Sequence, residues 1–225
     1  MNQTLTVKYK TFGTLYSIRK ELERIEKTCS IVSFDIETRS IYNKEQRDMA
    51  KQYLAMWDNL PIERVNELTR ILYSSGLSHP SMVQTTHIII GLDLEYSSIF
   101  IVDEKLEKYV FNWLVRSKLK FIIHNASFDL QVVYHRTGKF PEDYEDTQQL
   151  AKALINDCNN YHSKTGLKLL VGSYYPPRWS IKEETDYEVR NLKDEHFLEY
   201  CAIDGSAALL LWSNLQESIK EKDNT

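Results

Sequence analysis

The sequence has few cysteines and no long apolar run, and both absences narrow the classes of protein to which it can belong. Its cysteines, Cys29, Cys158 and Cys201, lie far apart and fit no zinc-ligand spacing, so we expect buried thiols in a reducing cytoplasm. No apolar stretch approaches the ~20 residues that span a bilayer, and the N-terminal residues lack the apolar core of a secretory signal. We therefore expect a protein without a membrane partner.

An excess of positive charge is missing as well. The formal net charge is −4 in 225 residues. Because nucleic-acid binding usually leaves a basic footprint, this charge argues mildly against that class of ligand. The argument weakens if some of the acidic residues hold divalent cations. The length and a hydrophobic content of 42% indicate one sizeable globular domain, residues 1–225.

Hydrophobic patterning predicts alternating strands and helices. A strand is expected at 5–10, and a helix follows Thr14, a residue that favours helix N-termini, with apolar residues at helical spacing: Leu15, Ile18, Leu22 and Ile25. Further strands are expected at 31–38, 87–94, 97–103 and 120–125. Further helices are expected at about 104–117, 126–136, 147–157, 165–173 and 194–220. This mixture predicts an α/β or α+β domain of three layers.

Residues 40–85 do not fit this rhythm, because roughly two helices separate two expected strands there. The second helix has Asn59 as a cap and Pro61 in its first turn, followed by apolar residues at helical spacing. We interpret 40–85 as a helical insertion. It leaves the end of the 31–38 strand and should stand near any site on that strand, although a packed hairpin without a functional role is an equal alternative.

The 31–38 strand, "IVSFDIET", carries two acids where a strand should be apolar. Because strand side chains alternate, Phe34 and Ile36 face one side, while Asp35 and Glu37 share the other, roughly 7 Å apart. Acids are poor strand residues, and like charges on one face repel. The pair is therefore expected to serve a function that needs both carboxylates.

Two later segments carry acids in comparable settings. Asn125 and Asp129 are four residues apart near the start of a helix and can share one face, although an isolated aspartate there is usually a surface residue that interacts with the helix dipole. Tyr200 and Asp204 have the same spacing in a strongly apolar helix. Burial of Asp204 is costly unless it is paired or metal-bound; the alternative is that it points outward.

Taken together, these segments predict an acidic pocket of four carboxylates: Asp35, Glu37, Asp129 and Asp204. Oxygen ligands suit hard cations such as Mg²⁺ or Mn²⁺ rather than zinc. Two such ions about 3.5–4 Å apart can clamp the attacking and leaving oxygens of a phosphoryl displacement. Bound cations would also offset the repulsion between the acids, which would then serve as metal ligands.

The motifs "FDIET", "HNASFD" and "YCAID" follow in an order that resembles the DEDD superfamily of 3′–5′ exonucleases, which have a ribonuclease H-like fold. Each motif is short, but the ordered set is specific. Tyr200 in the third motif makes the sequence similar to the subgroup that has tyrosine there, since the sister subgroup has histidine where this sequence has Glu199. Within it, the chain looks most like the proofreading domains of family A DNA polymerases, through "EDTQQLAKAL" and "GLKLLVGSYYP". The resemblance covers nearly the whole chain except about 40–85.

The resemblance implies a role for each matching residue and two divalent cations, Mg²⁺ or Mn²⁺. Asp35, Glu37 and Asp204 would hold the ion on the nucleophile side. Asp35 would also bridge to the second ion, which Asp129 would support largely through water. Tyr200 would orient the attacking water, and its ordinary pKa near 10 makes it a weak base.

Other residues are candidates for substrate binding. The resemblance implies that Asn125 and Phe128 position the terminal nucleotide, with core packing an equal alternative for Phe128. Residues 161–182 combine basic residues, including Lys168 and Arg178, with aromatic residues. This composition suits the binding of a single-stranded nucleic acid. Packing of that segment in the core is an equal alternative. Asp146 and Thr147 match a pair that recurs in the family, and for them we expect a turn or helix-cap role.

The leading hypothesis is a metal-dependent 3′–5′ exonuclease that releases nucleoside 5′-monophosphates from single-stranded or frayed DNA ends. The alternatives are an exoribonuclease similar to ribonuclease D and a non-catalytic nucleic-acid-binding subunit. Because no polymerase follows in the chain, a stand-alone enzyme is expected, which could dock on a separate DNA polymerase through 40–85. We expect it in the cytoplasm of a bacterium or a virus-infected cell.

Overall fold

The computed structural model describes residues 7–56, 60–72, 80–155, 166–174 and 191–223. The chain begins with β1 (Lys8–Phe12) and α1 (Leu15–Thr28). As predicted, α1 starts at Thr14, whose side-chain oxygen accepts from the N–H of Ser17 at 3.2 Å, while the Ser17 oxygen accepts from the N–H of Thr14. This reciprocal pair satisfies two N–H groups that the helix leaves open. Residues 5 and 6 of the predicted first strand, 5–10, lie outside the described residues.

The strands form two sheets that share one stretch of chain. The first has the order β1-β5-β4-β3 and the second the order β2-β6-β7. In the first, β1 is parallel to β5 and the other pairs are antiparallel; in the second, all pairs are parallel. The bounds are β2 (Ile31–Ser33), β3 (Asp35–Ser40), β4 (Val83–Gly91), β5 (Tyr96–Ile101), β6 (Lys120–Ile123) and β7 (Tyr144–Asp146).

The predicted 31–38 strand is split into β2 and β3 at Phe34. The first half pairs with β6 and the second with β4, and the N–H of Phe34 itself donates to the carbonyl of Ile122 at 2.9 Å. The split therefore joins the two sheets into one mixed layer. It also places Asp35 at the first position of β3, where the pairing partner changes.

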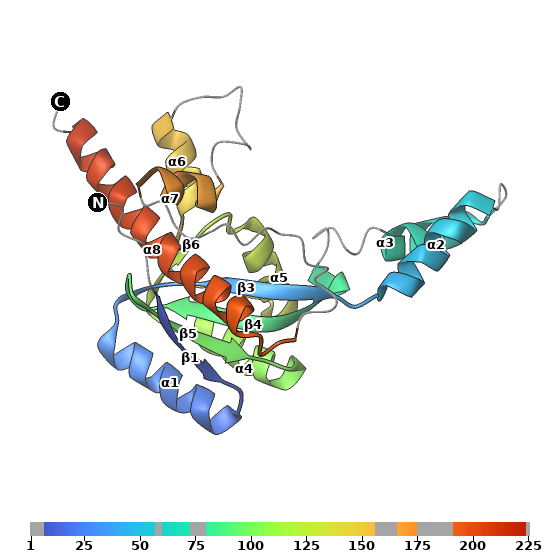
Figure 1. The fold of residues 1–225 in the computed structure, drawn as a ribbon, viewed down its shortest axis with the longest axis horizontal. Helices are drawn as coiled ribbons and strands as arrows, with labels where there is room; N and C mark the ends of the chain where they lie inside the picture. The colour runs from blue at the N-terminus through green and yellow to red at the C-terminus, as the bar shows by residue number, and fades with distance from the viewer. Residues whose placement is uncertain (1–6, 57–59, 73–79, 156–165, 175–190, 224–225) are drawn as a thin grey trace.

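Helices α1, α4 (Glu104–Leu114) and α5 (Ser127–Thr137) cover one face of this layer, and α8 (Glu195–Asp223) covers the other (Figure 1). Two further helices, α6 (Thr147–Ile155) and α7 (Leu167–Tyr174), pack against α8. One core joins α1, α4 and α5 to the sheet and contains Phe34, Ile36 and Ile88. A second core joins α8 to the opposite face and contains Ile89. Neighbouring strand residues thus point to opposite layers, and the predicted three-layer α/β architecture is confirmed.

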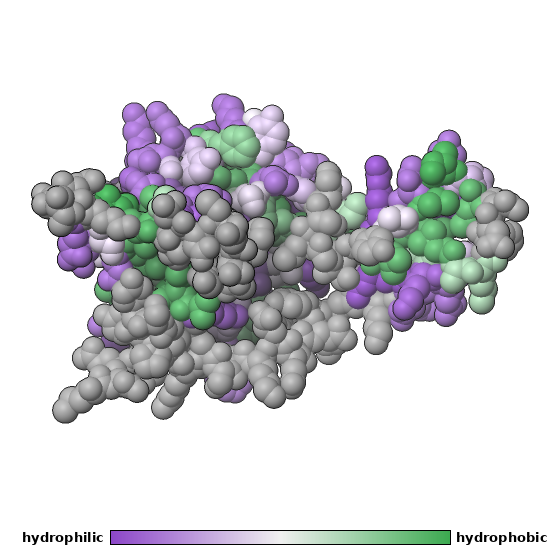
Figure 2. Space-filling view, turned by 90° about the horizontal axis from the view of Figure 1, so that it is seen from above, coloured by the Kyte–Doolittle hydropathy of each residue, from purple (hydrophilic) through white to green (hydrophobic). Residues whose placement is uncertain are grey.

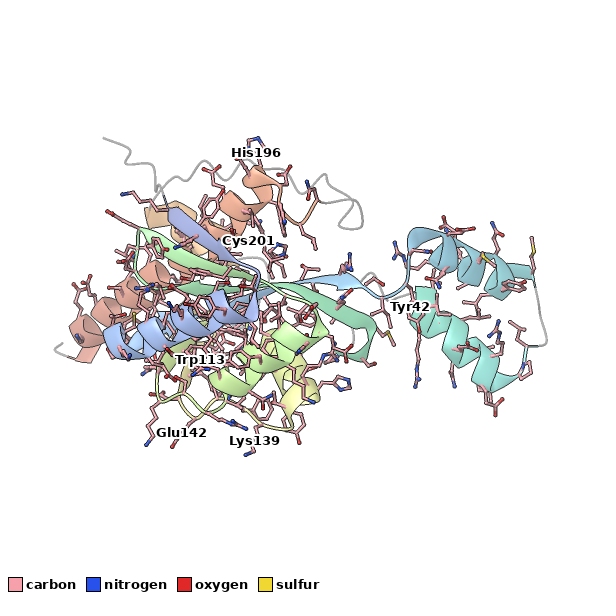
Figure 3. The ribbon with its side chains drawn as sticks, turned by 90° about the horizontal axis from the view of Figure 1, so that it is seen from below. Tyr42, Trp113, Lys139, Glu142, His196 and Cys201 are labelled. Atoms are coloured by element: carbon pink, nitrogen blue, oxygen red, sulfur yellow. The ribbon has the colours of Figure 1, made fainter. Side chains whose placement is uncertain are left out.

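Close packing fixes α8 on the sheet. A Cβ added to Gly91 would lie 2.3 Å from the Ser33 hydroxyl oxygen, and one added to Gly205 would lie 2.7 Å from a methyl of Ile89. The Ser33 hydroxyl donates to the carbonyl of Gly205 at 2.7 Å and accepts from the N–H of Gly91 at 3.0 Å. These contacts hold the helix against the strands and so determine where Asp204, the preceding residue, lies. Along the same helix, Cys201 faces the sheet and His196 points away (Figure 3).

Between β3 and β4, the chain forms α2 (Lys44–Met56), α3 (Ile62–Leu72) and a short 3₁₀ turn at Pro80–Met82. The two helices project from the sheet, with Tyr42 near their base (Figures 1 and 3). Apolar side chains gather on their surface (Figure 2), and Met56 is 75% exposed. The predicted cap of the second helix, Asn59, lies outside the described residues.

Candidate active site

Carboxylates from a strand and two helices meet where β3 passes between α5 and α8. Asp35 and Glu37 lie on β3, opposite Ile89 and His87 of β4. Burial raises the pKa of Asp35 well above its usual range, and the charges of three further acids raise it more: Asp129, Glu37 and Asp204. The structure thus brings the other three acids predicted for the pocket within electrostatic reach of Asp35.

Asp129 is fastened to the strand that carries the first two acids. It lies in the first turn of α5, is 6% exposed, and its Oδ1 accepts from the N–H of Ile36 at 3.2 Å. Ile36 stands between Asp35 and Glu37, so this bond fastens the acid of the helix to the strand, where its charge acts on Asp35. Burial raises the pKa of Asp129 to about 7.

Tyr200 lies one helical turn before Asp204 on α8. Burial, and then the charges of Asp204 and Glu37, raise the pKa of Tyr200 far above its usual value near 10. The phenol therefore keeps its proton and donates a hydrogen bond to Asp204. Phe197 stacks on the ring, with centroids 6.4 Å apart and an interplanar angle of 17°. A phenol whose pKa is raised this far is a poor general base.

Lys168 of α7 reaches the same tyrosine. Its ammonium lies 3.4 Å from the Tyr200 hydroxyl oxygen and 4.6 Å from the centre of the ring. This places a positive charge beside the acidic pocket. Of the other candidates for substrate binding, Asn125 is exposed at the start of the turn before α5, whereas Phe128 is half-buried against the large core. Arg178 lies outside the described residues.

His87 is a residue of this region that sequence reasoning missed. Burial lowers the pKa of His87, and its Nε2 donates to the carbonyl of Leu192, just before α8, at 2.8 Å. Its Nδ1 lies 3.0 Å from the Thr86 hydroxyl, which is 3.1 Å from the carbonyl of Glu37. The edge of its ring packs on Phe197. A histidine directly before an apolar run, "HIIIG", was the available signal.

The atoms that the pocket offers as metal ligands are of the kind that a hard divalent cation prefers. They are oxygens only, and the repulsion that raises the pKa of Asp35 is what a cation would relieve. Within the described ranges, however, no three carboxylate, imidazole or thiol groups already lie in an arrangement that could hold a metal ion.

Comparison with known proteins places the chain in a family. A family model described as 3′–5′ exonuclease matches residues 100–220. Comparison with curated proteins gives no match.

Several solved structures share the fold. Ribonuclease D of Escherichia coli, an exoribonuclease involved in structured RNA processing, has a TM-score of 0.62 at 18% identity and covers 96% of this chain. Brucella melitensis NrnC has a TM-score of 0.61 at 17% identity, with coverage of 98% of this chain and 85% of that one. The catalytic core of RRP6 from Trypanosoma brucei has a TM-score of 0.66 at 13% identity over 99% of this chain and 50% of that one.

This chain spans about half the length of ribonuclease D, 46% of it. At these identities the likeness concerns the fold, and it confirms the predicted ribonuclease H-like architecture. The family match extends over more than half of the chain and takes in Asn125, Asp129, Tyr200 and Asp204. The chain therefore belongs to the 3′–5′ exonuclease family, as the ordered motifs predicted.

Proposed function

We propose that this chain is a metal-dependent 3′–5′ exonuclease that hydrolyses the terminal phosphodiester of a nucleic acid and releases nucleoside 5′-monophosphates. The observation that carries the proposal is the meeting of four carboxylates with Tyr200 at one end of β3. Two Mg²⁺ or Mn²⁺ ions would be held by these carboxylates: Asp35, Glu37, Asp129 and Asp204. When bound, such cations neutralise charge on the phosphate and activate the attacking water.

The side chains of the pocket have separate tasks in this proposal. Tyr200 donates the hydrogen bond of its hydroxyl to Asp204 and keeps the proton. Its hydroxyl oxygen, which the Lys168 ammonium approaches at 3.4 Å, would accept a further hydrogen bond from the attacking water and aim it. Because the phenol stays protonated, the proton of the water must leave toward another acceptor. Lys168 beside the ring would bind a phosphate of the substrate, and Asn125 would contact the terminal nucleotide. Phe128 and Arg178 stay candidates for the same task.

We propose DNA with a single-stranded or frayed 3′ end as the substrate. The middle segments of the chain, which are similar to proofreading domains, support it. A second candidate is RNA or a short oligoribonucleotide. It is favoured by the similar structures: ribonuclease D is an exoribonuclease, a Trypanosoma brucei ribonuclease D is in complex with RNA U12, and NrnC is seen bound to pGG and with Mg²⁺.

A panel of 5′-labelled substrates tests both proposals: single-stranded DNA, mismatched duplex DNA and RNA, each with Mg²⁺ or Mn²⁺. We expect stepwise shortening from the 3′ end, which EDTA stops and which the double variant Asp35→Ala, Glu37→Ala lacks. The matched control is Asp93→Ala, Glu95→Ala, the same Asp-x-Glu spacing in the exposed turn between β4 and β5. An active double variant, or an enzyme insensitive to EDTA, would contradict the proposed site.

The partner and the location stay predictions from the sequence. Within the described part of the chain, every helix is too short or too polar to cross a bilayer. We propose that the projecting α2 and α3 are where a separate DNA polymerase would dock, because they stand apart from the sheet. Size-exclusion chromatography with a candidate polymerase tests this: a shared peak that persists after deletion of both helices rejects it.

A further inference from the structure

Asp146 reaches across the sheet to the turn that leads into α5. It is the last residue of β7 and pairs with Ile123, the last residue of β6. Because parallel strands end at the same edge of a sheet, its side chain meets the chain leaving β6. Its Oδ1 accepts from the N–H of Asn125 at 3.0 Å, and its Oδ2 accepts from the N–H of Ala126 at 3.0 Å.

The same carboxylate caps α6. Oδ1 also accepts from the N–H of Gln148 at 2.8 Å and from that of Gln149 at 3.4 Å, the helix-cap role predicted from the sequence. A cap of this kind needs one oxygen, which serine supplies as well as aspartate. The two bonds to the β6–α5 turn go beyond capping, because they engage both oxygens on a different segment of the chain.

That turn needs an outside partner. Asn125 has φ 57° and is the sole non-glycine residue with positive φ in the described ranges. Most side chains disfavour this left-handed conformation, and asparagine tolerates it better than most. The hydrogen bonds that Asp146 accepts from the N–H groups of Asn125 and Ala126 fix it here. Ala126 stands at the cap position of α5 and provides no side-chain cap. Thr147 adds a second fastening, since its hydroxyl lies 2.9 Å from Nδ1 of His124.

The fastened turn bears two residues of the proposed site. Asn125 is the candidate contact to the terminal nucleotide, and Asp129 follows within the first turn of α5, bonded to the N–H of Ile36. We propose that Asp146 is a positioning residue of the nuclease: it clamps the β6–α5 turn and thereby holds Asn125 and Asp129 in register with β3. This role rests on the proposed function. Both of its oxygens accept from backbone N–H groups of this turn, and this bridging is what makes Asp146 a clamp.

Asp146→Ser separates the clamp from the cap, because serine caps α6 but cannot bridge two N–H groups of the neighbouring turn. We expect thermal unfolding close to that of the parent and amide hydrogen exchange of Asn125 and Ala126 at least about tenfold faster. We expect kcat to fall roughly tenfold or more, with a smaller change in KM, since misplacing reacting groups lowers the rate of the chemical step. Asp146→Ala, which loses both roles, should also unfold at a lower temperature.

The control is Asp143→Ser, which removes an exposed acid just before the same strand and should change none of these quantities. Two results would overturn the inference: unchanged exchange at Asn125 and Ala126 in Asp146→Ser, or faster exchange with an unchanged kcat. A parent enzyme that degrades no substrate would refute the proposed function instead. Exchange in the variant would then still show whether Asp146 holds the turn.

Discussion

Glu21 and Asp35 are both acids set against the same sheet, but their surroundings shift their pKa values in opposite directions. Glu21 of α1 is 7% exposed and accepts from Arg24 at 2.9 and 2.6 Å and from the Ser98 hydroxyl at 2.6 Å. Burial alone would raise the pKa of Glu21, yet these hydrogen bonds lower it. The pKa of Asp35 is raised by burial and raised again by neighbouring acids.

The comparison distinguishes Glu21, whose charged carboxylate stabilises the fold, from Asp35, whose charged carboxylate destabilises it. A buried acid with its own hydrogen-bond donors favours the folded state when charged. Acids that face one another oppose folding at neutral pH unless a cation or a proton joins them. The pocket at β3 therefore has the electrostatics of a binding site, and the Glu21 cluster has those of a structural support.

Of the substitutions that test this difference between the pocket and the Glu21 cluster, Asp129→Asn should have the largest effect. The pKa of Asp129, about 7 in the fold, lies above the usual value near 4, so the protonated acid stabilises the fold at low pH and this stability is lost as pH rises through 7. Asparagine is neutral and can still accept from Ile36. With EDTA at pH 8, the variant should be more stable by on the order of 2 kcal/mol, with little difference at pH 4.

The same variant should lose activity about a hundredfold or more, because a proposed metal ligand is gone. Thermal unfolding at both pH values and the labelled-substrate assay measure the two effects. Equal stability of variant and parent at pH 8 would show that the acids of the pocket do not oppose folding.

Tyr200→Phe should come next in size. Phenylalanine keeps the stacking on Phe197 but loses the hydroxyl that would aim the water, so kcat should fall roughly tenfold to a hundredfold, since misaligned reacting groups lower the rate of the chemical step. Because the phenol stays protonated, parent and variant should share the same alkaline limb of the pH–rate profile. An alkaline limb that disappears in the variant would mean that the tyrosine titrates during the reaction.

Lys168→Met tests the basic side chain that lies against Tyr200. Methionine keeps much of the aliphatic stem but removes the charge, so KM should rise about fivefold and depend less steeply on salt. Steady-state kinetics at two salt concentrations measure this. Lys118→Met, at an exposed position before β6, is the matched control, and an equal rise in KM for both variants would assign the effect to overall charge.

Glu21→Gln should have the smallest effect on activity, with turnover within about twofold of the parent, since the residue lies away from the pocket. Stability should fall by about 1–2 kcal/mol in urea unfolding, because the bonds to Arg24 and Ser98 weaken. The loss stays moderate since the Arg24 side chain is 46% exposed and water can replace its partner. A large loss of activity without a loss of stability would remove the distinction between the two regions.

Local patterns sufficed for many elements. The cap at Thr14, the apolar face of α1 and the helices that begin near Ser127 and Glu195 follow from neighbours within one or two turns. The split at Phe34 was not predicted, because a change of partner strand leaves no mark on the alternation of side chains. The strand β7, only three residues long, is too short to show a period.

The acids of the pocket were predicted as a set, because their order and spacing are properties of the chain itself; their roles in catalysis stay proposals. The sequence alone determined which residues carry charge and which helix or strand bears them. Tertiary structure decided how they are held: His87 against Leu192, Ser33 against Gly205, and Asp146 against the turn at Asn125. Each of these bonds joins residues far apart in the chain, so only the folded packing of strands and helices brings donor and acceptor together.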